Sequence, residues 1–327
     1  MLFVHGMGDF HPDNVIDNAF LESLDIGTDD AWITKRVGIK ERRTSLPLDY
    51  IRETRNTEIR NCLDASPLTH LDFVTKAAEH AIERAGIDKE QIGMVVCDPG
   101  GQFYRTPAVS NLLADALGVK GLCFDLGTAC ATFGLQLHVL NNMAPEALPD
   151  YILVALGSPI SWITNYNDRN TAVLFGDAAA AAVVSPRIEG GMRVLGTSAG
   201  SDSSQWSKIQ SPIYGHFTLD GQAVQKFAIK QAVATAKSVL PEDSAGWGER
   251  YFIGHPANMA MLRLACRFLE VPDAYHLHNI ERYGNTGQSS APAVLSENWD
   301  RFTPGEEVVL SVVGGGLTWS GVRLQKL

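Results

Sequence analysis

The stretch GLCFDLGTACATFGLQLHVL, residues 121–140, joins an apolar run that predicts a strand to a spacing of apolar residues that predicts a helix. Cys130 stands at the join. A thiol at the start of a helix meets unpaired backbone N–H groups and the positive end of the helix dipole, and both favour the thiolate. Gly127, Thr128 and Ala129 allow the tight turn that such a position needs. A lone cysteine is more often a small buried hydrophobe, so packing and reactivity both stay open for Cys130 at this point.

Strand-like and helix-like segments alternate around this stretch, and the alternation occurs twice along the chain. The first series is IGMVVCD, TPAVSNLLADALG, GLCFDL, ATFGLQLHVLNNM and DYILVALGS. The second series is RYFIGHPA, NMAMLRLACRFL, AYHLHNI, TGQSSAPAVLSENW and EEVVLSVVGGG. Alternation at this spacing predicts a layered α/β fold with much parallel strand pairing.

The two series keep a common register. Cys130 lies 34 residues after Val96 of the first strand, and Asn285 lies 32 residues after Ile253 of the corresponding later strand. The strand that follows comes at a similar distance in both series, at 24 residues after Cys130 and 25 after Asn285. A register shared over this length indicates an internal duplication with two similar halves that meet face to face. Asn285 therefore corresponds to Cys130.

This duplication predicts two domains. Pro, Gly and charged residues cluster at 184–194 between two strand-like runs, which is typical of a connection. We therefore expect an N-terminal half over 1–185 that carries the cysteine, and a C-terminal half over 186–327 that carries histidine and asparagine. The segment 46–72 breaks the pattern because it is rich in charged and turn residues, and we interpret it as an insertion of loop or short helices over one face.

The composition excludes several classes of function. The chain has 327 residues, 20% of them charged, with a formal net charge of −10 and no run of Lys or Arg, which disfavours a nucleic-acid partner. No apolar run is long enough to span a membrane, and the first residues lack the basic start of a signal peptide. Five cysteines without a CxxC pair favour reduced thiols, so we expect a cytoplasmic protein with no membrane association.

A reactive Cys130 needs partners, and two loops can supply them. His255, in IGHPAN, directly follows a strand at the carboxyl edge of the second half, where α/β sheets place their sites. Asn285, in YGNTG, shares the register of Cys130, so the three side chains are expected to converge. Taken alone, His255 is more often structural, but the shared register favours a site. The glycine run at 312–319 lacks the Lys of a phosphate loop and instead predicts an oxyanion hole.

Two competing motifs carry less weight. GTSAG at 196–200 matches the nucleophile elbow of serine hydrolases, but it runs into the loop-like SDSSQWSKIQSP instead of an apolar helix. His276 and His278 share one face of a predicted strand, yet no carboxylate cluster accompanies them, so we interpret both as structural. We predict no metal site.

With these residues identified, the chain resembles the branch of the thiolase superfamily formed by the ketoacyl-acyl carrier protein (ACP) synthase III enzymes. DDAWITKRVGIKERR is similar to the N-terminal signature of that family, LGTACATF to its nucleophile elbow, and VLFGDAAAAAVV to its FGDGAGA strand. GHPAN, YGNTGQSSAP and GGGLTWSGVRL are similar to its histidine loop, asparagine loop and C-terminal strand. The resemblance covers nearly the whole chain apart from 46–72, and it implies a duplicated five-layer αβαβα fold and a homodimer.

The resemblance also implies the roles of the catalytic residues. Cys130 would accept an acyl group as a thioester, while His255 and Asn285 would hold a second thioester and stabilise the enolate formed on it. The backbone N–H groups of Cys130 and Gly315 would bind the acyl oxyanion. An imidazole and an amide stabilise an enolate without a metal. CoA or phosphopantetheine thioesters enter this scheme as substrates, so no cofactor is expected.

Further positions match family contacts with CoA. Trp32 and Arg169 match the pair that sandwiches the adenine, and Arg36 matches a phosphate contact. Lys226 aligns with a basic position near the mouth of the pantetheine channel. The resemblance therefore implies acyl-CoA, acyl carrier protein, or both, as partners.

Some positions depart from the family pattern. Compact chain-initiating members carry Phe where this chain has Thr106, in the segment that reaches across the dimer into the acyl pocket, so a wider pocket is expected. Members that join two long chains carry a glutamate base there, which Thr106 cannot replace. Ala260 stands where the family has Arg after its histidine motif, which weakens the expectation of carrier-protein docking.

These features are similar to those of ketosynthase III-like enzymes of secondary metabolism. We therefore expect a Claisen condensation through acyl-Cys130 that joins two carrier- or CoA-bound chains in the biosynthesis of a polyketide or fatty-acid-derived natural product. The alternatives are initiation of fatty acid synthesis from acetyl-CoA and malonyl-ACP, transfer of an acyl group to oxygen or nitrogen, and a catalytically silent subunit with a thiolase fold.

Overall fold

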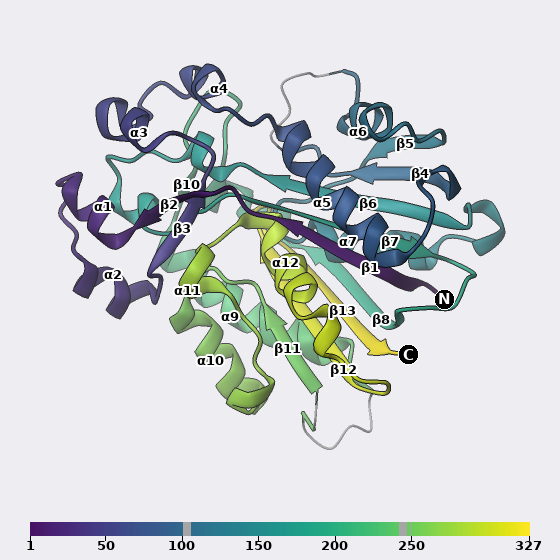
Figure 1. The fold of residues 1–327 in the computed structure, drawn as a ribbon. Helices are drawn as coiled ribbons and strands as arrows, with labels where there is room; N and C mark the ends of the chain where they lie inside the picture. The colour runs from purple at the N-terminus through teal and green to yellow at the C-terminus, as the bar shows by residue number, and fades with distance from the viewer. Residues whose placement is uncertain (101–105, 242–246, 249) are drawn as a thin grey trace.

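A computed structural model describes residues 1–100, 106–241, 247–248 and 250–327. The described residues form a sheet of nine strands in the order β11-β12-β13-β8-β1-β7-β6-β4-β5 (Figure 1). The bounds of these strands are β1 Phe3–Phe10, β4 Ile92–Cys97, β5 Leu122–Asp125, β6 Tyr151–Ser158, β7 Ala178–Ser185, β8 Met192–Ser201, β11 Arg250–Gly254, β12 Glu307–Gly314 and β13 Thr318–Lys326. Two short antiparallel pairs lie apart from it, β2 Asn14–Asp17 with β3 Glu41–Thr44, and β9 Ile209–Gln210 with β10 Thr218–Leu219.

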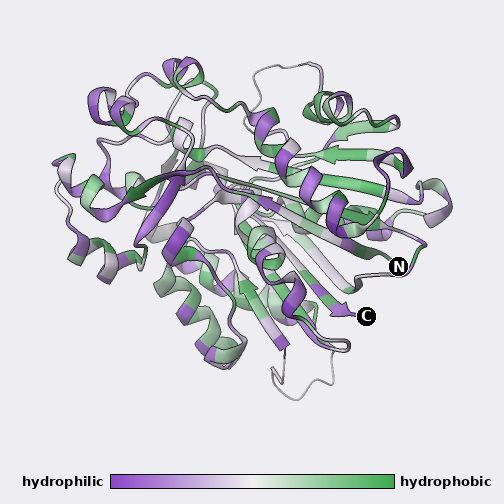
Figure 2. Ribbon diagram, in the orientation of Figure 1, coloured by the Kyte–Doolittle hydropathy of each residue, from purple (hydrophilic) through white to green (hydrophobic). Residues whose placement is uncertain are grey.

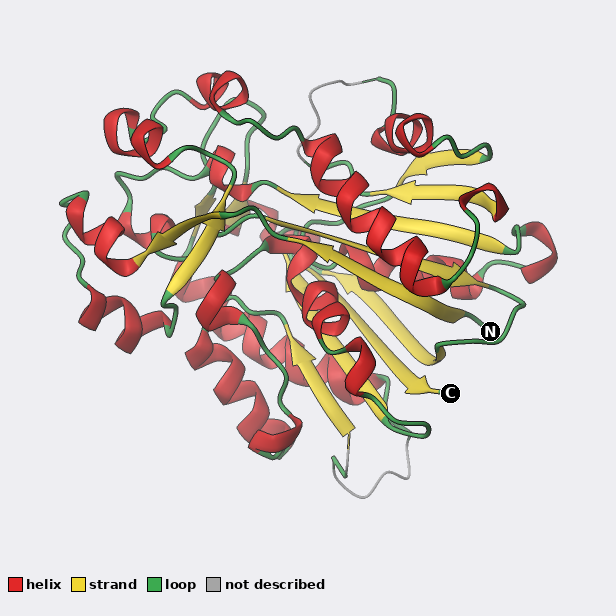
Figure 3. Ribbon diagram, in the orientation of Figure 1, coloured by secondary structure: helices red, strands yellow, loops and turns green. Residues whose placement is uncertain are grey.

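Helices cover the strands on both sides (Figure 3). The α-helices are α1 Asn18–Ser23, α2 Asp30–Val37, α3 Leu48–Thr54, α4 Cys62–Ala65, α5 His70–Ala85, α6 Val109–Leu117, α7 Thr132–Asn142, α8 Arg169–Ala172, α9 Gly221–Ser238, α10 Met259–Leu269, α11 Ile280–Tyr283 and α12 Ser290–Glu297. The 3-10 helices are η1 Ile59–Asn61, η2 Lys89–Gln91, η3 Pro145–Ala147, η4 Ile160–Ile163, η5 Ser203–Lys208, η6 Asp273–Tyr275, η7 Gly287–Ser289 and η8 Trp299–Arg301.

Helix α5 shows how the sequence builds these layers. Thr69 caps its start, because the Thr69 hydroxyl accepts from the backbone of Asp72 while the Asp72 carboxylate accepts from that of Thr69. Gly86 ends the helix in the left-handed conformation, at φ 64°. Hydrophobic and hydrophilic residues alternate along α5 with a helical period, as Figure 2 shows, and its apolar side packs on β1 and β7.

The strand pairing confirms the predicted α/β class. Strand β4 pairs in parallel with β5 and β6, and β11 pairs in parallel with β12. The strands between them, β7, β1, β8 and β13, are antiparallel to their neighbours. The strands from 1–185 lie on one side of the sheet order and those from 186–327 on the other. They meet where Phe3 and Val4 of β1 pair with β8.

The core is divided into layers. Helices α7 and α12 share a central core with strands of both halves, through side chains such as Leu137 of α7 and Val294 of α12. A second core lies between α5, α6 and the N-terminal strands, and another between α9, α10 and the C-terminal strands. Helices α7 and α12 therefore pack between the strands of the two halves, while α5, α6, α9 and α10 cover the outer sides.

Three segments bear on the sequence predictions. AYHLHNI, predicted as a strand, makes a single bridge from His276 to Phe252, and its two ends belong to η6 and α11. GTSAG at 196–200 lies inside β8 and forms no elbow. The segment 46–72 contains α3, η1 and α4 before α5 begins. Among the described helices, none has the length and hydrophobicity needed to cross a membrane.

Candidate active site

One cavity of about 1890 Å³ lies at the carboxyl ends of the parallel strands. It is lined by both halves of the chain. The structure brings the three residues from the sequence register together in it, since Cys130, His255 and Asn285 all line this cavity. Gly314 and Gly315, from the predicted oxyanion loop, line it as well.

Cys130 lies in a tight turn between β5 and α7. Ala129 adopts a φ of 48°, a left-handed conformation that is costly for a residue with a Cβ atom. The Thr132 hydroxyl holds the turn, because its Oγ1 accepts from the N–H of Thr128 at 2.8 Å and donates to the carbonyl of Ala129 at 2.6 Å. These bonds fix the backbone on both sides of the thiol.

The protonation state of Cys130 differs from the sequence prediction. The position near a helix start was expected to favour the thiolate, but burial raises the pKa of Cys130 to about 12. Helix α7 begins at Thr132, two residues after Cys130, so removal of the thiolate from water outweighs the helix dipole. Burial therefore opposes the thiolate that the nearby helix start was expected to favour.

His255 follows β11 directly, and its backbone N–H donates to the carbonyl of Ser311 at 3.0 Å. Burial lowers the pKa of His255 to about 4, so the imidazole is neutral at pH 7. Its Nδ1 atom is buried without a hydrogen-bond partner in the part of the chain that the structure describes. A neutral imidazole in this cavity can donate one hydrogen bond and accept another.

Asn285 lies in the loop after α11 and is held from two sides. Its backbone N–H donates to Leu174 at 2.8 Å, and its carbonyl accepts from Gly176 at 3.1 Å. The side-chain Oδ1 accepts from the N–H of Gly287 at 2.9 Å. Because Oδ1 is fixed as the acceptor, the amide Nδ2 is left as a donor for a ligand.

The glycine loop closes tightly over the cysteine turn. A Cβ atom on Gly314 would lie 2.9 Å from the backbone nitrogen of Cys130, so a side chain there would displace the turn. Thr318 fixes the loop, since its hydroxyl lies 2.9 Å from the carbonyl of Gly315 and 3.1 Å from that of Thr128. The oxyanion role of Gly315 stays a prediction supported by this proximity.

The residues expected to bind CoA divide into two groups. Trp32 and Arg36 line the cavity, and the Arg169 guanidinium stacks on the Trp32 ring at 4.8 Å from the ring centroid. An adenine between Trp32 and Arg169 would require the two side chains to separate. Thr106 and Lys226 are exposed and stand outside the described lining of the cavity. Thr106 also adjoins 101–105, which lie outside the described residues.

Sequence reasoning missed one wall of the cavity. Ile209, Ile213, Tyr214 and Phe217 line it from the segment that connects β8 to α9. The Arg60 guanidinium stands 4.7 Å from the centroid of the Tyr214 ring and joins this wall to η1. The only signal in the sequence was a group of apolar residues in a stretch without regular periodicity.

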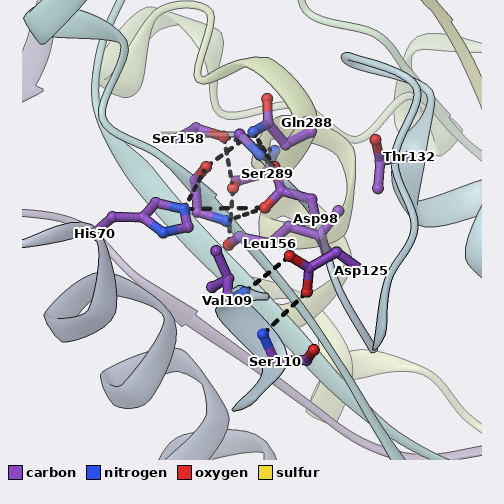
Figure 4. Close-up of polar contacts among 12 residues, drawn as sticks. His70, Asp98, Val109, Ser110, Asp125, Thr132, Leu156, Ser158, Gln288 and Ser289 are labelled. Atoms are coloured by element: carbon purple, nitrogen blue, oxygen red, sulfur yellow. Dashed lines mark hydrogen bonds and ion pairs between the residues drawn. The ribbon is translucent and has the colours of Figure 1, made fainter. Parts of the chain in front are cut away.

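Sequence reasoning also missed a buried carboxyl group. Asp98 follows β4 and lines the cavity, and three donors point at it (Figure 4). Its Oδ1 accepts from Gly157 N–H at 3.0 Å, and its Oδ2 accepts from Gly100 N–H at 2.9 Å and from Gln288 Nε2 at 2.6 Å. Burial raises the pKa of Asp98 to about 7. His70 Nε2 lies 4.0 Å from Oδ1, but burial lowers the pKa of His70 to about 4, so this pair is no ion pair at pH 7.

Comparisons with known proteins agree with this arrangement. The family described as 3-oxoacyl-[acyl-carrier-protein (ACP)] synthase III matches residues 124–203, and its C-terminal family matches 249–326. Beta-ketoacyl-[acyl-carrier-protein] synthase III of Chlamydia muridarum is 31% identical over 99% of both chains. The same enzyme of a Sulfurovum species is 28% identical over 97% of this chain and 94% of its own.

A solved structure extends the agreement to three dimensions. The 3-oxoacyl-[acyl-carrier-protein] synthase III of Aquifex aeolicus superposes with a TM-score of 0.87 and 28% identity, over 99% of this chain and 100% of the other. The predicted thiolase-like fold is confirmed by this similarity together with the layers described above.

Proposed function

Because this chain belongs to the 3-oxoacyl-[acyl-carrier-protein] synthase III family, and so is an acyl-transferring condensing enzyme, we propose that Cys130 carries the acyl group and that a malonyl-type thioester on acyl carrier protein attacks it. The observation that carries this proposal is the cavity shared by the Cys130 thiol, the neutral His255 imidazole and the Asn285 amide. Acyl-CoA supplies the first acyl group, with Trp32, Arg36 and Arg169 beside its nucleotide.

The first step transfers the acyl group. The Cys130 sulfur attacks the thioester carbonyl, and the departing thiolate takes the Cys130 proton as the new C–S bond forms. Burial raises the pKa of Cys130 to about 12, so the attacking thiol carries a proton that it gives up in this step. The backbone N–H groups of Cys130 and Gly315 receive the negative charge that develops on the carbonyl oxygen.

The second step forms the carbon–carbon bond. The carbonyl oxygen of the malonyl-type thioester accepts hydrogen bonds from the His255 imidazole and from Asn285 Nδ2. Both donors are neutral, and Gly287 orients the Asn285 amide, so the pair stabilises the enolate that forms as CO₂ leaves. The enolate carbon attacks acyl-Cys130, and the cysteine leaves as the thiolate.

Intact-mass spectrometry tests the first step. The wild-type protein incubated with acetyl-CoA and longer acyl-CoA thioesters is expected to gain one acyl group, and Cys130→Ala is expected to gain none. Cys123→Ala is the matched control, because Cys123 is a partly exposed thiol on β5, and it should acylate like the wild type. No adduct on the wild type, or an adduct that survives Cys130→Ala, contradicts the proposal.

The substrates separate the remaining alternatives. The relatives are beta-ketoacyl-[acyl-carrier-protein] synthase III enzymes, which favours condensation on acyl carrier protein. The joining of two long chains stays a prediction, and it would show as product without malonyl-dependent CO₂ release. Acyl transfer to oxygen or nitrogen needs no enolate, so the shared placement of His255 and Asn285 favours condensation. The homodimer also stays a prediction, and sedimentation of the purified chain tests it.

A further inference from the structure

Asp98 and His255 occupy corresponding positions in the two halves. Each is the residue directly after a parallel strand, β4 for Asp98 and β11 for His255. The backbone N–H of Asp98 donates at 3.0 Å to the carbonyl of Ala155 on β6, the neighbouring strand in the sheet. The backbone N–H of His255 donates at 3.0 Å to the carbonyl of Ser311 on its neighbouring strand β12. The carboxyl group therefore stands in the N-terminal half where the imidazole stands in the C-terminal half.

The Asp98 carboxylate connects the two halves. Gln288, from the C-terminal half, donates through Nε2 to Asp98 at 2.6 Å and to the carbonyl of Gly157 at 2.8 Å, as Figure 4 shows. A short bond from an amide to a carboxylate is among the stronger hydrogen bonds in a buried site. The Asp98 side chain is 2% exposed, so water does not compete for it.

This connection leads to Asn285. Gln288 directly follows Gly287, and the N–H of Gly287 is the group that holds Asn285 Oδ1. The Gly287 backbone has a φ of 59° and packs against the Ile160 side chain. Gln288 is thus linked through one residue to the N–H group that orients the Asn285 amide.

We propose that Asp98 is a positioning residue for the condensation step, which holds Gln288 and through it keeps the Asn285 amide aimed at the second thioester. This inference rests on the proposed function. Acylation of Cys130 does not use the Asn285 amide, so the loss of Asp98 should slow condensation and spare acylation.

The charge on Asp98 sets a pH dependence. His70 from α5 and Asp125 from β5 face the Asp98 carboxyl group, and Cys97 precedes it on β4. The pKa of Cys97 is raised and that of His70 is lowered, so both side chains are neutral between pH 5 and 8. Asp98 has a pKa of about 7, and its protonated form would turn an O–H toward one of three donors. Condensation should therefore fall relative to acylation as the pH drops below about 7.

Asp98→Leu tests the inference. A leucine has no acceptor atom, so the bond from Gln288 Nε2 is lost. Acylation measured by intact mass should stay within about twofold, while condensation with malonyl-ACP should fall by about 10- to 100-fold, since small misplacements of catalytic groups cost this much. The fall in the ratio of condensation to acylation below pH 7 should also disappear. Asp115→Asn is the control, because Asp115 is an exposed carboxylate on α6 and is expected to keep the wild-type ratio.

Gln288→Leu removes the other partner of the same bond and provides the test if Asp98→Leu fails to fold. It should show the same selective loss of condensation. A folded variant with the wild-type ratio overturns the inference, and so does an equal loss in both steps, which indicates a general structural role. Absence of an acyl adduct on wild-type Cys130 instead removes the proposed function and the inference with it.

Discussion

The ends of β4 and β11 place Asp98 and His255 in matching backbone positions, yet the two side chains have opposite surroundings. Asp98 accepts three hydrogen bonds, from Gly157, Gly100 and Gln288. His255 Nδ1 has no partner within the described chain. Both residues line the cavity, so the duplicated fold keeps a backbone position at this edge while the hydrogen-bonding surroundings of the side chain differ.

Replacement of His255 should have the largest effect on the rate of condensation. In His255→Ala the enolate loses one of its two donors, so condensation should fall by about 10²- to 10³-fold, as for the loss of an oxyanion donor. Acylation of Cys130 should change little, and single-turnover assays of both steps measure the difference.

His276→Ala is the control for this variant. Burial also lowers the pKa of His276 to about 4, but His276 lies beside β11 outside the described lining of the cavity. It should condense within about twofold of the wild type. Equal losses in His255→Ala and His276→Ala would show that a buried histidine near β11 matters only for folding.

The same pair should have opposite effects on stability as the pH changes. The pKa of Asp98 is raised to about 7, so the folded state holds its proton more tightly and stability falls as the pH rises from about 4 to 7. The pKa of His255 is lowered to about 4, so the unfolded state binds the proton more tightly and stability rises as the pH rises from about 4 to 6.5.

Urea unfolding at several pH values measures these contributions. The free energy of unfolding of Asp98→Asn is subtracted from that of the wild type, and the difference should fall as the pH rises. The corresponding difference for His255→Asn should rise with pH. Each change should be at most about 4 kcal/mol. If both differences changed with pH in the same direction, Asp98 and His255 would not have the opposite pKa shifts inferred for them.

The two halves also differ in the position of one tryptophan each, and replacing these tryptophans should have the smallest effect on activity. Trp32 of the N-terminal half lines the cavity, whereas Trp206 of the C-terminal half is 63% exposed and stands outside the described lining. Trp32→Ala should raise the KM for acetyl-CoA about tenfold by removing one stacking contact, and leave the KM for acetyl-pantetheine unchanged. Trp206→Ala is the matched control, and a rise in KM for both thioesters in Trp32→Ala would argue against an adenine contact.

Local patterns were enough for much of the fold. Strand and helix positions around Cys130 and Asn285 were predictable because hydrophobic periodicity reflects which side of an element is buried. The common register then predicted that both residues, with His255, reach the same sheet edge, and one cavity contains all three. AYHLHNI was predicted wrongly as a strand: its composition is strand-like, but its two ends belong to η6 and α11 and only His276 bridges to β11.

The sequence by itself determined which residues meet, because register along parallel strands depends only on spacing. Tertiary structure decided their chemical states, because burial depends on segments far apart in the chain. Desolvation holds Cys130 as a thiol despite the nearby helix start. It also raises the pKa of Asp98, whose partner Gln288 is 190 residues away. Spacing places a functional group, and the surrounding side chains and the exclusion of water set its charge.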